Sequence, residues 1–237
     1  MSVSIIIPTY NRKRFELLIE HNINSQTYYN IKEIIILDDS DIDRPLSIKT
    51  KNPIRYYTLP RCSIGTKRNV GVYHATSDYI CHMDTDDMYD ANYISYSIFE
   101  TISSGKPICG SADMNMYSKG QFYKQKCLYI QMLNEATMVF KKSVWTTPFN
   151  DTNSNEAAPF LSNHLGDIVE ANIDRLMCCI AHDHNTVPKK QWLQDQYKTK
   201  PLPQYKKHLE ILSQINVLCR YITIQELSHR NKTTLFP

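Results

Sequence analysis

Short apolar runs alternate, along the first part of the chain, with segments whose apolar residues recur at helical spacing. Four runs have the length and composition of buried strands: residues 3–7, 33–37, 54–58 and 79–83. Residues 12–25 lie between the first two runs and residues 63–75 between the last two, and both predict helices. This order predicts an α/β fold with an open, mostly parallel sheet flanked by helices.

The rest of the chain continues the pattern less regularly. The further predicted elements are a helix at 93–103, a strand at 108–110, a hairpin at 114–124, a strand at 137–140, a short helix at 141–145, a helix at 160–176, a strand at 177–181 and C-terminal helices at 205–218 and 222–230. We interpret residues 1–115 and 116–200 as two halves of one domain, and 201–237 as a C-terminal helical segment.

Polar residues follow three of the predicted strands directly: Thr9 to Asn11, Asp38 to Asp41, and Asp84 to Asp87. In open parallel sheets, ligands bind beyond the carboxyl ends of the strands. Three carboxylates within four residues, at Asp84, Asp86 and Asp87, repel one another unless a cation lies among them, and a divalent metal would supply it. The alternative is an Asp-rich surface turn, but the convergence of three strand ends favours a ligand site.

Composition bears on whether the protein binds nucleic acid, spans a membrane or is secreted. The 237 residues carry a net charge of +3, which gives no argument for nucleic acid as a partner. No run approaches the ~20 apolar residues of a membrane span, and no signal peptide is recognisable at the N-terminus. The seven cysteines lack CxxC spacing and are expected to be reduced. We therefore expect a cytoplasmic protein without a transmembrane segment, and its oligomeric state stays open.

Three further groups could carry chemistry. Lys67 and Arg68 place two cations at a predicted helix start, where backbone N–H groups also attract anions. His182 and His184, two residues apart at a strand end, could both face one metal, or could be ordinary surface histidines. Glu156, in a polar loop, could be a general base or simply an acid at a helix start.

The ordered motifs resemble family 2 glycosyltransferases, which have the GT-A (Rossmann-like) fold. The matching stretches are residues 4–12 (SIIIPTYNR), 36–40 (ILDDS), 65–71 (GTKRNVG), 83–87 (MDTDD) and 182–186 (HDHNT). The first four cover about the first 115 residues in the family's order and spacing. The second half otherwise matches poorly, as an acceptor-binding region would. The resemblance therefore implies that residues 1–115 form a nucleotide-sugar-binding half and residues 116–200 an acceptor-binding and catalytic half of the same domain.

The resemblance implies roles for individual residues. Asp84-Thr85-Asp86 looks like the family's DxD element, with Asp86 on Mn²⁺ or Mg²⁺ and Asp84 on the ribose side or also on the metal. His182 is the favoured further metal or phosphate ligand, and His184 is the second choice. The expected contacts of the nucleotide-sugar are Pro8, Thr9, Tyr10, Arg12, Asp38, Asp39, Lys67, Arg68, Asn69, Asp84 and Thr85.

The chain departs from the family at the catalytic base. Many members carry Glu-Asp after a glycine-rich loop, whereas residues 153–158 read NSNEAA here. We expect Glu156 to be the base, with Asp151 and Asp167 as alternatives.

The expected activity is transfer of a sugar, of the hexosyltransferase type, from a UDP-, GDP- or dTDP-sugar to a hydroxyl of a glycan, glycoprotein or small-molecule acceptor. The reaction would be metal-dependent and inverting. The alternatives are a sugar-phosphate nucleotidyltransferase, which normally has a glycine-rich loop near its N-terminus that is missing here, and an inactive nucleotide- or glycan-binding module.

Overall fold

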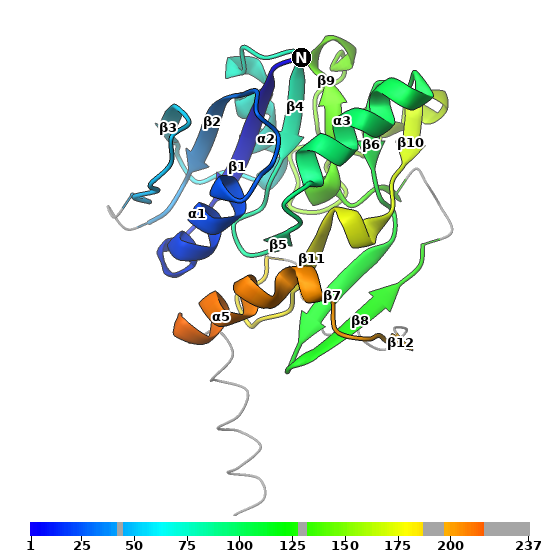
Figure 1. The fold of residues 1–237 in the computed structure, drawn as a ribbon. Helices are drawn as coiled ribbons and strands as arrows, with labels where there is room; N and C mark the ends of the chain where they lie inside the picture. Colours follow the sequence, from blue (N-terminus) through cyan, green and yellow to red (C-terminus); the bar gives the residue numbers. More distant parts are fainter. Residues whose placement is uncertain (42–44, 128–131, 187–196, 216–237) are drawn as a thin grey trace, which may run out of the picture.

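The computed structural model describes residues 1–41, 45–127, 132–186 and 197–215 (Figure 1). Within these ranges the main sheet has the strand order β10-β6-β9-β4-β1-β2-β3. Its strands are β1 (Val3–Thr9), β2 (Ile31–Asp38), β3 (Ile54–Thr58), β4 (Tyr79–His82), β6 (Ile108–Gly110), β9 (Val139–Lys141) and β10 (Ile168–Glu170). All neighbours pair in parallel except β9, which runs antiparallel to β4 and β6.

Burial explains the centre of this sheet. Every residue of β1 is buried, and so are all residues of β2 except the exposed Lys32. Strands covered on both faces read as continuous β-branched and apolar runs, which is why residues 3–7 and 33–37 were recognisable. The predicted α/β fold with a mostly parallel sheet is confirmed.

A second sheet lies below the main one in Figure 1, with the order β12-β8-β7-β11-β5 among the described residues. Its strands are β5 (Met88–Tyr89), β7 (Met114–Ser118), β8 (Gln121–Gln125), β11 (Met177–Ile180) and β12 (Tyr197–Lys198). The hairpin predicted at residues 114–124 is confirmed as β7 and β8. Lys119 and Gly120 form its turn with φ of 49° and 77°, a left-handed conformation that glycine adopts easily.

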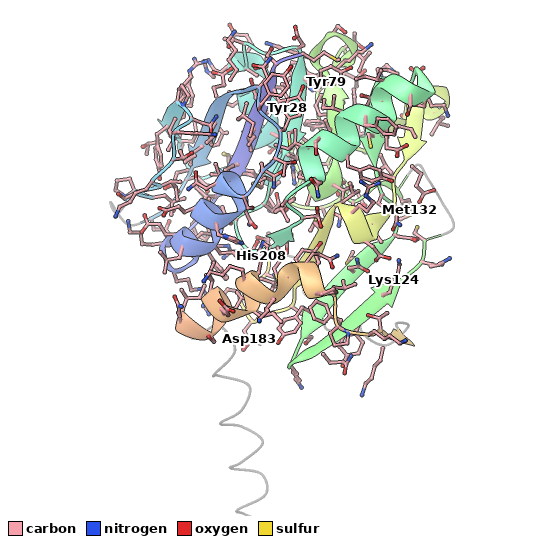
Figure 2. All side chains as sticks on the ribbon, in the orientation of Figure 1. Tyr28, Tyr79, Lys124, Met132, Asp183 and His208 are labelled. Atoms are coloured by element: carbon pink, nitrogen blue, oxygen red, sulfur yellow. The ribbon has the colours of Figure 1, made fainter. Side chains whose placement is uncertain are left out.

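The longer helices are α1 (Glu16–Asn24), α2 (Ile64–His74), α3 (Tyr93–Ser104) and α5 (Lys206–Gln214). Helix α2 packs on β1 and β2, and α5 packs on α1. His208 of α5 lies 3.0 Å from Asn22 Oδ1 of α1, which fixes the C-terminal helix to the sheet domain (Figure 2). No helix in the described ranges is long and apolar enough to cross a membrane.

The helix predicted at residues 160–176 is wrong. Only α4 (Ala158–Ser162) is α-helical there, followed by 3-10 turns at Leu165–Asp167 and Ile173–Arg175 and by the edge strand β10. Pairing of β10 with β6 outweighs the helical spacing of its apolar residues. Helix α5 confirms part of the helix predicted at 205–218. The helix predicted at 222–230 lies outside the described residues, and the division at residues 115 and 200 stays a prediction.

Candidate active site

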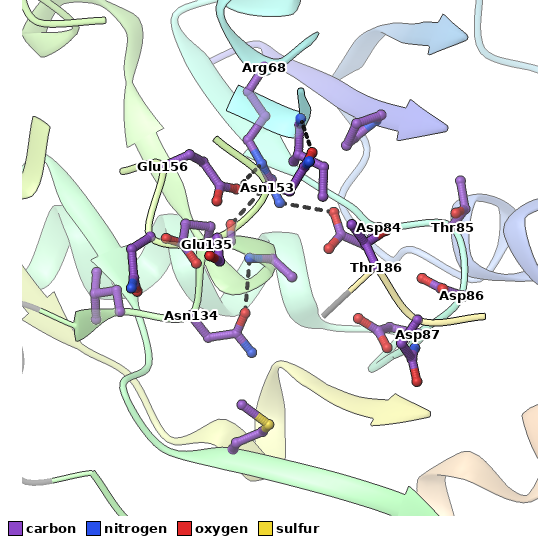
Figure 3. Close-up of a pocket in the computed structure, with 18 of the residues that line it drawn as sticks. Arg68, Asp84, Thr85, Asp86, Asp87, Asn134, Glu135, Asn153, Glu156 and Thr186 are labelled. Atoms are coloured by element: carbon purple, nitrogen blue, oxygen red, sulfur yellow. Dashed lines mark hydrogen bonds and ion pairs between the residues drawn. The ribbon is translucent and has the colours of Figure 1, made fainter. Parts of the chain in front are cut away.

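A cavity of about 360 Å³ opens beyond the carboxyl ends of β1 and β4 (Figure 3). One wall comes from residues 8–12, a second from the start of α2, and a third from residues 84–87 after β4. The opposite wall comes from residues 132–136 and 153–156. Segments far apart in the sequence thus meet where the topology of an α/β sheet puts ligand sites.

The three acids after β4 have different partners. Asp84 Oδ1 accepts a bond of 3.0 Å from Arg68, and Asp86 Oδ2 lies 3.0 Å from both Arg12 Nη2 and His182 Nε2. Asp87 is buried and accepts the backbone N–H of Ile180 at 3.0 Å. All three line the cavity. The bond from Ile180 shows that Asp87 also holds β11 against the segment after β4.

Arg68 is the central cation of the cavity, with a side chain only 2% exposed. Its Nε donates to Glu156 Oε1 at 3.0 Å, and its Nη2 donates to Asp84. Burial alone would lower the pKa of Arg68, but the charges of Asp84 and Glu156 outweigh it and raise this pKa. Figure 3 shows Asp84 on one side of the guanidinium and Glu156 on the other.

The acids at the end of β2 lie among their own partners. Asp39 is bonded to buried Lys67, to Arg61 Nη1 at 2.6 Å and to the backbone N–H of Cys62 at 3.0 Å. Burial by itself would raise the pKa of Asp39, but these hydrogen bonds and the charge of Lys67 lower it overall. Asp38 is bonded to Ser40 and Tyr56, and lines a smaller cavity of about 140 Å³ shared with Thr9 and Arg12.

The loop before α4 accepts hydrogen bonds from the first backbone N–H groups of α2. Asn153 Oδ1 accepts from the N–H of Ile64, and the carbonyl of Thr152 accepts from that of Gly65, both at 3.0 Å. A Cβ at position 65 would meet the carbonyl oxygen of Asn150 at 1.8 Å, so this approach requires glycine. The expectation that these N–H groups attract an anion is therefore wrong, since the loop already occupies them.

The three acids considered as the catalytic base lie in different places relative to the cavity. Glu156 is buried and lines the cavity, whereas Asp151 accepts from the hydroxyls of Ser63 and Thr66 at the start of α2. Asp167 pairs with His164 at 2.8 Å and is absent from the cavity wall. Asn69, predicted to contact the donor, bonds to the backbone of Phe149 instead.

Glu135 is a cavity residue that the sequence did not reveal. It begins the 3-10 turn η3 (Glu135–Thr137), which leads into β9. Burial, and then the charge of Glu156, raises the pKa of Glu135 to about 7. The sequence carries no signal for this position, because only the antiparallel direction of β9 brings the start of that strand to the carboxyl end of β4.

The two histidines are not equivalent. The ring of His182 is buried against Phe15, and its Nδ1 accepts the backbone N–H of His184 at 3.2 Å. Its Nε2 therefore carries the proton that faces Asp86. His184 is exposed, and its carbonyl accepts from Arg12 at 2.8 Å. The structure thus brings His182, and not the side chain of His184, to Asp86.

Comparison with known proteins gives partial matches of modest identity. A glycosyltransferase of Rickettsia felis without assigned function is 36% identical over 91 residues, 37% of this chain and 15% of that protein. The amylovoran biosynthesis glycosyltransferase AmsB of Erwinia amylovora is 27% identical over 106 residues, 41% of this chain and 35% of that protein. The chain thus spans well under two thirds of the length of these relatives.

Among solved structures, residues 1–349 of S. aureus TarS in complex with UDP-GlcNAc superpose with a TM-score of 0.64. That match covers 92% of this chain and 66% of the TarS chain at 15% identity, which bears on the fold alone. The family model described as glycosyl transferase family 2 matches residues 4–156, more than half of the sequence. The chain therefore belongs to glycosyl transferase family 2 and has the GT-A fold.

Proposed function

We propose that this chain transfers a sugar from a nucleotide-diphospho-sugar to an acceptor hydroxyl. The observation that carries the proposal is the 360 Å³ cavity in which the carboxylates of Asp84 and Glu156, from two distant segments, meet one buried guanidinium. This volume is within the usual range for small-molecule sites. The TarS neighbour, solved with UDP-GlcNAc, supports a UDP-sugar as the first donor to test before GDP- and dTDP-sugars.

The donor would lie along β1 and the start of α2. Pro8, Thr9, Tyr10 and Arg12 line the cavity there. The hydroxyl of Thr9 is buried and has no hydrogen-bond partner among the described residues. A buried polar group without a partner is costly, so a ligand that bonds to Thr9 would stabilise this wall.

The nucleoside would extend toward the end of β2. Asp38 lines the smaller cavity beside Thr9, and a carboxylate there can accept from a ribose hydroxyl or from the N3–H of a pyrimidine. Asp39 already has partners in Lys67 and Arg61, so we propose that it orients Lys67 beside the donor.

A metal site fits the residues around Asp86. Carboxylate oxygens suit Mg²⁺ and Mn²⁺, which are commonly held by one or two carboxylates and completed by substrate phosphates. Among the described residues, no group of three or more His, Cys, Asp or Glu is assembled as a metal cage. Asp86 would therefore hold the ion, helped by Asp84 and by His182, whose Nε2 could ligate in the tautomer that carries the ring proton on Nδ1. When bound, the ion would supply positive charge to the leaving diphosphate.

The chemistry would be a single displacement with inversion. Glu156 would take the proton of the acceptor hydroxyl. General-base catalysis of this kind typically accelerates a reaction by ~10²–10⁴-fold. Arg12, 11% exposed, and buried Arg68 would hold charge near the diphosphate.

Thermal-shift measurements with UDP-GlcNAc, with and without Mn²⁺, test the proposal. A donor at a hundredfold excess over its Kd would raise Tm by roughly 5–10 °C. The shift would disappear in Asp86→Ala and persist in Glu170→Gln, which changes an exposed carboxylate on β10. Absence of a shift with UDP-, GDP- and dTDP-sugars would contradict the proposal, and release of pyrophosphate instead of a nucleoside diphosphate would indicate a nucleotidyltransferase.

A further inference from the structure

Glu135 and Glu156 lie on the same side of Arg68 in the cavity (Figure 3). Arg68 donates to the carboxylate of Glu156 at 3.0 Å, but only to the backbone carbonyl of Glu135, at 3.4 Å. Within the described part of the chain, the carboxyl group of Glu135 makes no ion pair with a cationic side chain. Two acids thus face each other across a site where one cation is already shared with Asp84.

The position of Glu135 is fixed by its backbone. Its carbonyl lies 2.9 Å from Nδ1 of buried His82, and the next carbonyl, of Ala136, accepts from the hydroxyl of Tyr89 at 3.1 Å. The same Tyr89 oxygen accepts the N–H of Asp84 at 2.7 Å. The turn carrying Glu135 is therefore anchored to the residues on either side of the acidic cluster, which fixes its backbone beside the cavity.

The charges around this pair leave a deficit of positive charge. The titratable groups next to it are Arg68 from α2, Asp84 after β4, His82 on β4 and Tyr89 on β5, and the exposed Lys126 after β8 also lines the cavity. Burial lowers the pKa of His82 and raises that of Tyr89, so both are neutral near pH 7. One guanidinium thus faces three carboxyl groups, and one bound proton relieves their repulsion.

We propose that Glu135 and Glu156 act together as the base, two carboxyl groups beside Arg68 in one cavity that receive the proton of the acceptor hydroxyl. This inference rests on the proposed transfer reaction. The acceptor O–H bond breaks and its proton passes to the pair, while the oxygen forms a bond to the anomeric carbon. The bond from that carbon to the diphosphate breaks, and its electron pair leaves on the nucleoside diphosphate.

The pair gives a pH dependence that a single acid would not. Burial, and then the charge of Glu156, raises the pKa of Glu135 to about 7. Above that pH Glu135 is ionised, and the charge of Glu156 makes its carboxylate a stronger base. Below it the pair already holds a proton and accepts a second one poorly, so turnover is expected to rise with pH through about 7.

Thermal stability tests the shared proton without any substrate. When a carboxyl group has a higher pKa in the folded than in the unfolded protein, its contribution to stability is fully present below the unfolded-state pKa. That contribution is lost as pH rises through the folded-state pKa. Glu135→Gln, which cannot ionise, should therefore exceed the wild type in Tm by about 3–8 °C at pH 8 and by no more than about 1 °C at pH 4.5. Glu170→Gln is the control, with no pH-dependent difference expected. Equal differences at both pH values for Glu135→Gln would overturn the proposal.

The pH profile of UDP release from UDP-GlcNAc then tests catalysis. In Glu135→Gln we expect the inflection of kcat/KM to move at least about one pH unit to the acid side, with a ~10–100-fold loss at pH 8. Glu135→Asp should restore much of the rate. A rate loss with an unmoved inflection would mean a structural role and would overturn the proposal. If the wild type releases no nucleoside diphosphate from any sugar donor, the proposed function fails and the catalytic role fails with it, while the Tm series still decides the shared proton.

Discussion

The acids at the ends of β2 and β4 are the same residue type in similar places, but their charge environments differ. Asp39, after β2, is bonded to two cations of the chain, Lys67 and Arg61. After β4, Arg68 is shared between Asp84 and Glu156, with Glu135 close by. Asp39 thus has two cations to itself, whereas after β4 Arg12 pairs with Asp86 and a single Arg68 serves both Asp84 and Glu156, which leaves room for a metal ion or a proton. This difference separates acids that hold the fold from acids available for chemistry.

Removing the shared cation should have the largest effect on the fold. Arg68→Met would leave Asp84 and Glu156 without their cation in a buried site, at a cost of about 3–5 kcal/mol in the free energy of unfolding. Urea denaturation at pH 7 measures this cost. Lys207→Met, which breaks an exposed pair with Glu210, is the control and should change stability by less than about 0.5 kcal/mol.

The matched change after β2 is Lys67→Met. Asp39 would retain Arg61 and the N–H of Cys62, so we expect a smaller loss, of about 1–3 kcal/mol. A cost equal to or above that of Arg68→Met would break the comparison, because it would mean that the acids after β2 depend just as strongly on a single cation.

The two regions should also respond oppositely to pH. The pKa of Asp39 is lowered in the folded protein. The contribution of Asp39 to stability is therefore present above its unfolded-state pKa and is lost as pH falls through its folded-state pKa. Asp39→Asn should therefore destabilise by about 1–2 kcal/mol at pH 7 and by progressively less below about pH 4. Denaturation at a series of pH values measures this, and a pH-independent cost would show that the Asp39 charge is not the cause.

The sheet strands and the cavity wall formed by the first ninety residues were predictable because their signals are local. Continuous β-branched runs revealed β1 and β2, and acids placed directly after β4 revealed the cavity wall around Asp84 and Asp86. Glu135 and the cap on α2 were missed because both depend on long-range geometry: the direction of β9, and the approach of the Asn150 carbonyl to Gly65. Strand β10 was missed for the same reason, since its partner β6 lies far away in the sequence.

The most direct test of the central claim is the anomalous scattering of Mn²⁺ in crystals grown with UDP. The account predicts one strong Mn²⁺ peak bound to a carboxylate oxygen of Asp86, with the diphosphate in the cavity between Arg12 and Arg68. UDP bound elsewhere on the surface, or Mn²⁺ held away from Asp86, would contradict it.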